Sequence, residues 1–197
     1  MIYESPSVDV PLSQGDMIDD CTVLAWKPFQ TGSTESTVGE YFVRVVVITQ
    51  ACDLAQTKSE RVLVAVVHDA QSLVDRGVLK ASLIRDQIRM HRVYGWYFLP
   101  AGEGVPESVV DLRDLHTVPR TMLAGLIAGG QRLSRIVTPY REHLAQHFAT
   151  TYSRIAQGGT GWLALEPTGA RRYASKLAAC TIRAGVSGIY GGCVLTA

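Results

Sequence analysis

Three side chains that could form a catalytic site occur in or just after the apolar stretch VVVITQACDLAQ, residues 45 to 56. A nucleophilic cysteine needs a base beside it, usually a histidine, and a carboxylate that orients this base. Cys52 and Asp53 lie within the stretch, and His68 ends the next apolar segment. If the two segments pair with the right register, Cys52, Asp53 and His68 would form the site of a cysteine-dependent hydrolase.

A structural role for the same residues is the alternative, and we favour it. A carboxylate next to a thiol disfavours the thiolate form that attacks a substrate. Free cysteines are also among the most buried residue types. On this interpretation Cys52 fills the edge of the core, and Asp53 caps the turn that follows the strand.

Histidine spacing gives little support for a metal site. His143 and His147 are four residues apart, as two ligands on one helix face would be, but they lack the glutamate of an HExxH zinc helix. The other candidates share no spacing that a short loop or one helical turn supplies; they are Cys52, His68 and His91, with Asp53 or Cys21. We therefore expect no metal or other cofactor, and we expect the two helical histidines to lie on a solvated face.

A basic cluster precedes an aromatic segment near the middle of the chain. Spacings of four and three residues place Arg85, Arg89 and Arg92 along one side of a predicted helix, and Trp96 follows with two tyrosines. Basic groups for phosphates beside rings for bases are what a surface for single-stranded nucleic acid requires. These four residues are our candidate nucleic-acid-binding residues; the alternative is a solvated helix face followed by a core strand.

The composition excludes several classes of protein. Nineteen Lys and Arg against 18 Asp and Glu leave a net charge of +1, so any nucleic-acid site must be local. No apolar run approaches the roughly 20 residues of a membrane span. The start of the chain does not resemble a signal peptide, and the four cysteines contain no CxxC pair. We expect a cytoplasmic protein without membrane association.

Hydrophobic patterns predict an α+β domain. Two strands rich in β-branched residues, over 41–49 and 61–68, should pair as an antiparallel hairpin at the centre of a sheet. Other expected elements are strands over 17–25, 93–99 and 108–112, a short helix capped by Asp69, and helices over 79–91 and from Thr138-Pro139 onward. We predict one domain over residues 1–157, a small bent antiparallel sheet or SH3-like barrel with packed helices and a C-terminal helix. A glycine-rich, weakly structured tail should follow over residues 158–197.

Two resemblances rest on short motifs. Gly15-Asp16, the polar loop over 32–40 and the strand over 44–49 (RVVVIT) resemble the MazF and PemK type of small β-barrel, whose members are ribosome-independent RNA endonucleases or inert relatives. The stretch TQACDL, followed much later by TPYREHLAQHF, is similar to a group of uncharacterised bacterial proteins with a Ser/Thr-Gln-x-Cys-Asp motif. The first resemblance implies a small β-barrel fold shared with proteins that cleave RNA. The second implies a shared fold and no activity.

The sequence departs from the nuclease pattern at its catalytic pair. In the toxins an arginine lies six residues before the catalytic Ser or Thr, so both side chains share one face of a strand. Arg44 and Thr49 are five residues apart and should point to opposite faces. We therefore expect a non-catalytic binding or regulatory module, in a bacterial stress or defence setting that the resemblance alone implies. Its expected partner is single-stranded nucleic acid or another protein; a ribonuclease with a displaced active site and the cysteine hydrolase are the alternatives.

Overall fold

The computed structural model describes residues 1–26, 38–56 and 60–157 of the 197-residue chain. The chain divides into two compact units, Met1–Thr151 and Tyr152–Ala197, with the boundary inside the last described helix. The predicted glycine-rich tail, residues 158–197, lies outside the described residues, as does most of the predicted polar loop over 32–40. The fold described below is that of the first unit.

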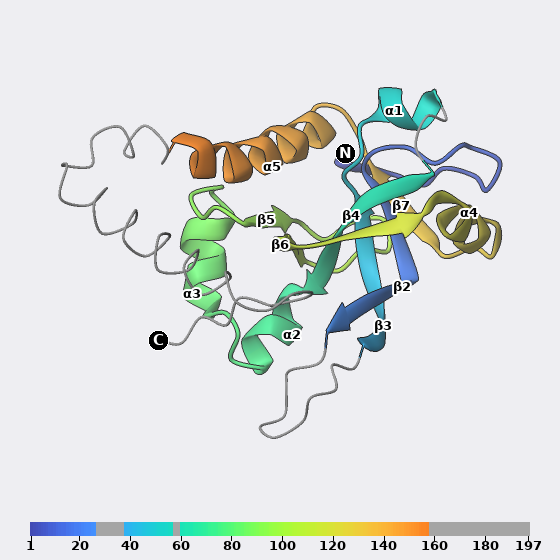
Figure 1. Cartoon of the computed structure of the whole chain (residues 1–197). Helices are drawn as coiled ribbons and strands as arrows, with labels where there is room; N and C mark the ends of the chain where they lie inside the picture. Colours follow the sequence, from blue (N-terminus) through green and yellow to red (C-terminus); the bar gives the residue numbers. More distant parts are fainter. Residues whose placement is uncertain (27–37, 57–59, 158–197) are drawn as a thin grey trace, which may run out of the picture. The chain divides into compact units, whose positions relative to one another are not determined.

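An open antiparallel sheet organises this unit (Figure 1). In the described part of the chain the sheet has seven strands, in the spatial order β1-β7-β2-β3-β4-β6-β5. The strands are β1 (Tyr3–Glu4), β2 (Asp16–Trp26), β3 (Val38–Val47), β4 (Arg61–Asp69), β5 (Trp96–Leu99), β6 (Ser108–Pro119) and β7 (Arg132–Ile136). The predicted α+β class is confirmed; because the sheet is not closed, the chain does not adopt the barrel form that was the other expectation.

Helices connect and flank these strands. They are α1 (Ala51–Ala55), α2 (Ala70–Asp75), α3 (Ala81–Leu83), the π-helix η1 (Ile84–Ile88), α4 (Arg120–Ala128) and α5 (Tyr140–Gln157). The Asp69 side chain accepts a hydrogen bond from the Ser72 backbone N–H at 2.9 Å, so the predicted cap of α2 is confirmed. The helix predicted over 79–91 is shorter in the structure than in the prediction. It begins as α3 at Ala81, continues directly as the wider π-helix η1, and ends at Ile88.

The β-branched residues of β3 are buried on both faces of the sheet. Val45 and Val47 pack on one face with apolar residues of α1 and α4, whereas Val46 packs on the other face with Leu144 of α5. Strand β4 pairs with β3 in the predicted antiparallel direction, with Val45 opposite Val66. A further apolar cluster joins α2, α3, η1 and β5. Since both of its faces are covered, β3 is a central strand, as predicted.

Gly15 occupies a position that other residues would strain. Its φ of +85° lies in the left-handed region, and a Cβ added there would approach the Ile136 carbonyl oxygen to 3.0 Å. The Gly15 N–H donates to the Val47 carbonyl at 2.9 Å, and the Gly15 carbonyl accepts from the Ile136 N–H at 3.0 Å. This glycine therefore links the end of β3 to β7, which gives the Gly-Asp motif a structural role.

Asp16, at the start of β2, holds two arginines of β7 and the N-terminal segment together. Its carboxylate accepts hydrogen bonds from Arg135 Nε at 2.6 Å, from Arg132 Nη1 at 3.4 Å and from the Ser13 backbone N–H at 2.9 Å. The same arginines donate to backbone carbonyls of residues 7, 10 and 11. Asp16 is fully buried, and both arginine side chains are largely buried. The network fastens the N-terminal segment across β2 and β7.

Replacing Asp16→Asn should destabilise the protein by about 3–5 kcal/mol, because two buried guanidinium groups lose their carboxylate. Urea unfolding followed by circular dichroism measures the change in unfolding free energy. Asp19→Asn is the matched control: Asp19 pairs with Arg44 at 2.6 Å, but both side chains are partly exposed, so the loss should be about 1 kcal/mol. Equal losses in the two variants would contradict the role assigned to Asp16.

Candidate functional site

Cys52 lies at the start of α1, and its side chain is exposed. Its Sγ is 3.6 Å from Gln50 Oε1 and 3.9 Å from Asp53 Oδ1. Leu54 takes the buried place in this turn and is 2% exposed. The prediction that Cys52 fills the edge of the core is therefore wrong, because the helical turn directs Leu54 toward the core instead.

The sheet register separates Cys52 from His68. Val64 of β4 lies opposite Val47, the last residue of β3, and Cys52 follows shortly after that end. His68 is four residues further along β4, about 13 Å away from Val64 at ~3.3 Å per residue. Cys52 and Asp53 therefore lie near one end of the hairpin and His68 at the other. The structure does not bring together the three residues of the predicted cysteine site.

The two described cysteines should differ sharply in their reaction with iodoacetamide at neutral pH. Burial raises the pKa of the Cys21 thiol to about 11, so Cys21 should stay unlabelled in the folded protein. Cys52 should be labelled, at the rate of a cysteine in an unstructured peptide, since Gln50 and Asp53 do not activate a thiol as an imidazole would. Peptide mapping by mass spectrometry measures both rates; labelling of Cys52 much faster than the peptide would revive the hydrolase hypothesis.

Arg44 and Thr49, the counterparts of the nuclease pair, are both engaged in structural contacts. Two guanidinium nitrogens of Arg44 donate to the Asp19 carboxylate at 2.6 and 3.1 Å. The Thr49 hydroxyl oxygen accepts a hydrogen bond from the Leu63 backbone N–H at 2.7 Å. Thr49 also lies beyond the end of β3 at Val47. This arrangement ties both side chains to neighbouring strands.

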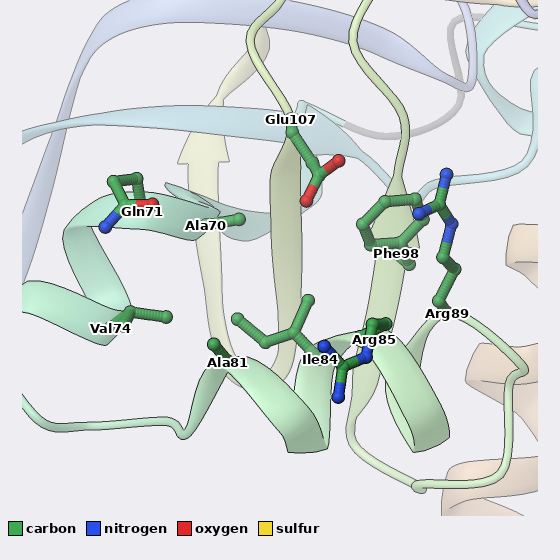
Figure 2. A pocket seen from close by; sticks show the side chains of 9 residues that line it. All are labelled: Ala70, Gln71, Val74, Ala81, Ile84, Arg85, Arg89, Phe98 and Glu107. Carbon is green, nitrogen blue, oxygen red and sulfur yellow. The ribbon is translucent and has the colours of Figure 1, made fainter.

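A pocket lies between α2, α3, η1, β5 and the segment before β6 (Figure 2). It has a volume of about 260 Å³. We call it the arginine pocket, and its lining residues are Ala70, Gln71, Val74, Ala81, Ile84, Arg85, Arg89, Phe98 and Glu107. Most of the lining residues come from the helices. Two of the predicted nucleic-acid-binding residues, Arg85 and Arg89, line this one cavity.

Charged and aromatic groups face one another across this pocket. The Arg85 side chain is 71% exposed and pairs with Asp86 at 2.8 Å. The Arg89 guanidinium lies over the Phe98 ring, with 5.1 Å between Cζ and the ring centroid. Figure 2 shows the Glu107 carboxylate on the segment that faces α3 and η1. The pocket therefore combines an apolar interior with cationic and anionic groups at its rim.

The other two predicted nucleic-acid-binding residues lie elsewhere. Arg92 is exposed but does not line the pocket. Trp96 is 6% exposed and belongs to the apolar cluster of α2, η1 and β5. The Arg113 guanidinium lies 4.2 Å from the centroid of the Trp96 ring and pairs with Asp111 at 2.9 Å. The Trp96 ring is thus covered. Phe98, which the sequence analysis did not single out, lines the pocket; it is also 6% exposed and in the same cluster, with the Arg89 guanidinium over its ring.

A second hollow gathers histidine and tyrosine side chains from the segment after η1, from β5 and from α5. We call it the histidine–tyrosine hollow; it has a volume of about 220 Å³, and its lining residues are His91, Tyr94, Tyr97, His143, Gln146, His147 and Thr150. The His91 ring centroid lies 6.1 Å from that of His143 and 5.8 Å from that of His147. His143 and His147 therefore face a third imidazole, which the sequence analysis did not connect with them.

Backbone conformation and burial set the properties of these imidazoles. His91 has a φ of +54°, which is uncommon for a residue other than glycine. Burial lowers the pKa of His91, and the nearby His147 and His143 lower it further. Burial also lowers the pKa of His147, against the opposing effect of the Val93 and Trp96 backbone carbonyls. Among the residues that the structure describes, no three His, Cys, Asp or Glu side chains are placed to share a metal ion.

Acid should destabilise the protein through these histidines. Because the pKa values of His91 and His147 are lowered on folding, the unfolded chain binds protons more readily, and stability is lost as pH falls below about 6.5. His91→Gln should therefore lessen the drop in melting temperature between about pH 7.5 and pH 5.5. Calorimetry at both pH values measures the drop. An unchanged drop, together with NMR titration of His91 at or above its usual pKa, would contradict this prediction.

The described residues thus form an α+β domain with an open antiparallel sheet, and its surface cavities include the arginine pocket and the histidine–tyrosine hollow, which differ in chemistry. The sequence matches no known family of proteins and none of the curated proteins. None of the described helices is long and apolar enough to cross a membrane. The functional argument therefore depends on the cavities themselves.

Proposed function

We propose that this domain is a non-catalytic binding module whose arginine pocket takes one nucleotide of a single-stranded nucleic acid. The observation that carries the proposal is that Arg85 and Arg89 line one cavity, with the Arg89 guanidinium over the ring of Phe98. Single-stranded nucleic acid is bound through cationic groups that contact phosphates and flat groups on which bases stack. The pocket offers both kinds of group within a short distance.

The lining of the pocket suits the base of a nucleotide better than it suits a charged part of the ligand. Ile84, Val74 and Phe98 supply an apolar interior, and the planar Arg89 guanidinium above Phe98 is itself a surface on which a base can stack. Glu107 and Gln71 stand at the rim, where a carboxylate and an amide can hydrogen bond to the amino and carbonyl groups of a base edge. Arg85 pairs with Asp86, but because both side chains are exposed this pair is weak and Arg85 can turn to contact a phosphate.

The charge of the chain as a whole does not attract nucleic acid. The net charge is +1, so attraction must come from this local group of arginines. Binding should therefore be of modest affinity and depend strongly on salt, because each phosphate contact releases counterions. An acidic peptide would share the salt dependence but would not need a stacking surface.

Arg85→Ala with Arg89→Ala should weaken binding of a fluorescent single-stranded oligonucleotide by about tenfold or more, because phosphate and stacking contacts are lost together. Fluorescence anisotropy at several salt concentrations measures the affinity. The slope of log affinity against log salt should fall by about 0.7 for each phosphate contact removed.

Arg76→Ala is the matched control, because Arg76 is an exposed arginine at the end of α2 that does not line the pocket. It should leave the affinity and the slope unchanged. Phe98→Leu should weaken binding without changing the slope, since it removes a ring and no charge. The proposal is wrong if the wild-type protein fails to bind at low salt, or if the Arg76 variant loses as much affinity as the double variant.

No comparable observation favours the two catalytic hypotheses. A cysteine hydrolase would need a base beside Cys52, and the register of β3 and β4 keeps His68 away from it. A ribonuclease would need Arg44 and Thr49 to be free for RNA, and both contact neighbouring strands. Binding without catalysis is therefore the function that we put forward.

A further inference from the structure

The histidine–tyrosine hollow adjoins the arginine pocket through one short segment of chain. Arg89 lines the arginine pocket, and His91, two residues later, lines the hollow. Arg92, which is exposed, follows directly. The turn after η1 therefore carries residues of both cavities.

We infer that the hollow is a second subsite for the same single strand, in which a phosphate group binds between the imidazoles of His91, His143 and His147. This inference rests on the proposed function, because it places the phosphate of a neighbouring nucleotide beside the one in the arginine pocket. The volume of the hollow, about 220 Å³, is ample for a phosphate and part of a sugar.

The groups around the imidazoles favour an anion. Besides the three histidines, the lining consists of the phenols Tyr94 and Tyr97, an amide and a hydroxyl, and no carboxylate lines the hollow among the described residues. The Tyr97 hydroxyl donates to the Tyr140 backbone carbonyl at 3.4 Å. Glu142, next in sequence to His143, is held by Arg141 at 2.9 Å.

One nitrogen in the hollow lacks a partner. In the described structure the Nε2 atom of His147 is buried and makes no hydrogen bond. A buried polar atom without a partner costs free energy, which a bound acceptor or donor recovers. Among the described residues, the three histidines are not placed to share a metal ion that would occupy this nitrogen. A phosphate in the hollow can recover part of this cost when the His147 ring turns its Nε2 toward it.

Proton linkage gives this subsite a signature of its own. Without ligand, burial keeps the pKa values of His91 and His147 low, and the neighbouring histidines lower that of His91 further, so these two imidazoles are neutral at pH 7. A phosphate between them stabilises the protonated form and raises these pKa values. Affinity should therefore rise as pH falls toward the pKa of the free protein. Arginine side chains stay charged throughout this pH range, so contacts with them give no such pH dependence of affinity.

The test uses the full chain and a fluorescent oligothymidylate of about ten nucleotides, a length within the site sizes of single-strand-binding domains. Anisotropy is measured at constant ionic strength near pH 7.6 and near pH 5.8. The wild type should bind about threefold tighter, or more, at the lower pH. His91→Gln with His147→Gln, which removes the two histidines of the hollow whose pKa values are lowered, should abolish this difference.

His116→Gln is the matched control, because His116 pairs with Asp114 on β6 and lies outside the hollow. It should keep the full pH dependence. Circular dichroism at both pH values confirms that each variant is folded. A pH dependence that is absent in the wild type, or that persists in the double histidine variant, overturns the second subsite.

Failure of this inference and failure of the proposed function give different results. If only the second subsite is wrong, the Arg85→Ala, Arg89→Ala variant still loses binding and the histidine variants behave as the wild type. If the proposed function is wrong, the wild type binds the oligonucleotide at neither pH. An acidic peptide that binds with the same histidine-dependent pH profile, while oligothymidylate does not, would also overturn both.

Discussion

The buried carboxylate of Asp16 is the constraint on which the arrangement of this domain depends. A charge in the interior is tolerated only with close partners, and Asp16 has them in Arg132 and Arg135, which lie more than one hundred residues away. This requirement fixes β7 against β2 and carries the N-terminal segment with it. Because α5 begins four residues after β7 ends, the same contact sets where α5 starts, and with it the place of His143.

Local patterns predicted the centre of the sheet well. The alternation of Val45 and Val46 between two covered faces is a property of the strand itself, and the Asp69 cap is made within four residues. Strand β7 was missed for the opposite reason. Its sequence, RLSRI, contains two arginines that become suited to a buried strand only when they meet Asp16, and that contact depends on the complete fold. Helix α4 was also missed, since Gly125 interrupts its apolar sequence.

The candidate site shows the same division between local and distant information. The helical spacing of Arg85 and Arg89 was visible in the sequence, and both line one pocket. Phe98 and Glu107 come from other elements, and no spacing rule connects them with the arginines. Trp96 was the aromatic candidate in the sequence analysis, but the structure places Arg113 over its ring. The contact between His91 and the histidines of α5 joins residues more than fifty positions apart in the sequence, so no local pattern predicts it.

The π-helix η1 gives the segment between the two cavities a tolerance to one change in chain length. A π-turn holds one residue more than the α-turn it replaces, so the segment can lose a single residue and continue as an α-helix with its flanking residues in their directions. Each further residue lost from an α-helix would turn the following chain by about 100°, which would rotate Arg89 away from Phe98. The segment Ile84–Ile88 can therefore absorb one deletion, but not two, while Arg89 stays over Phe98.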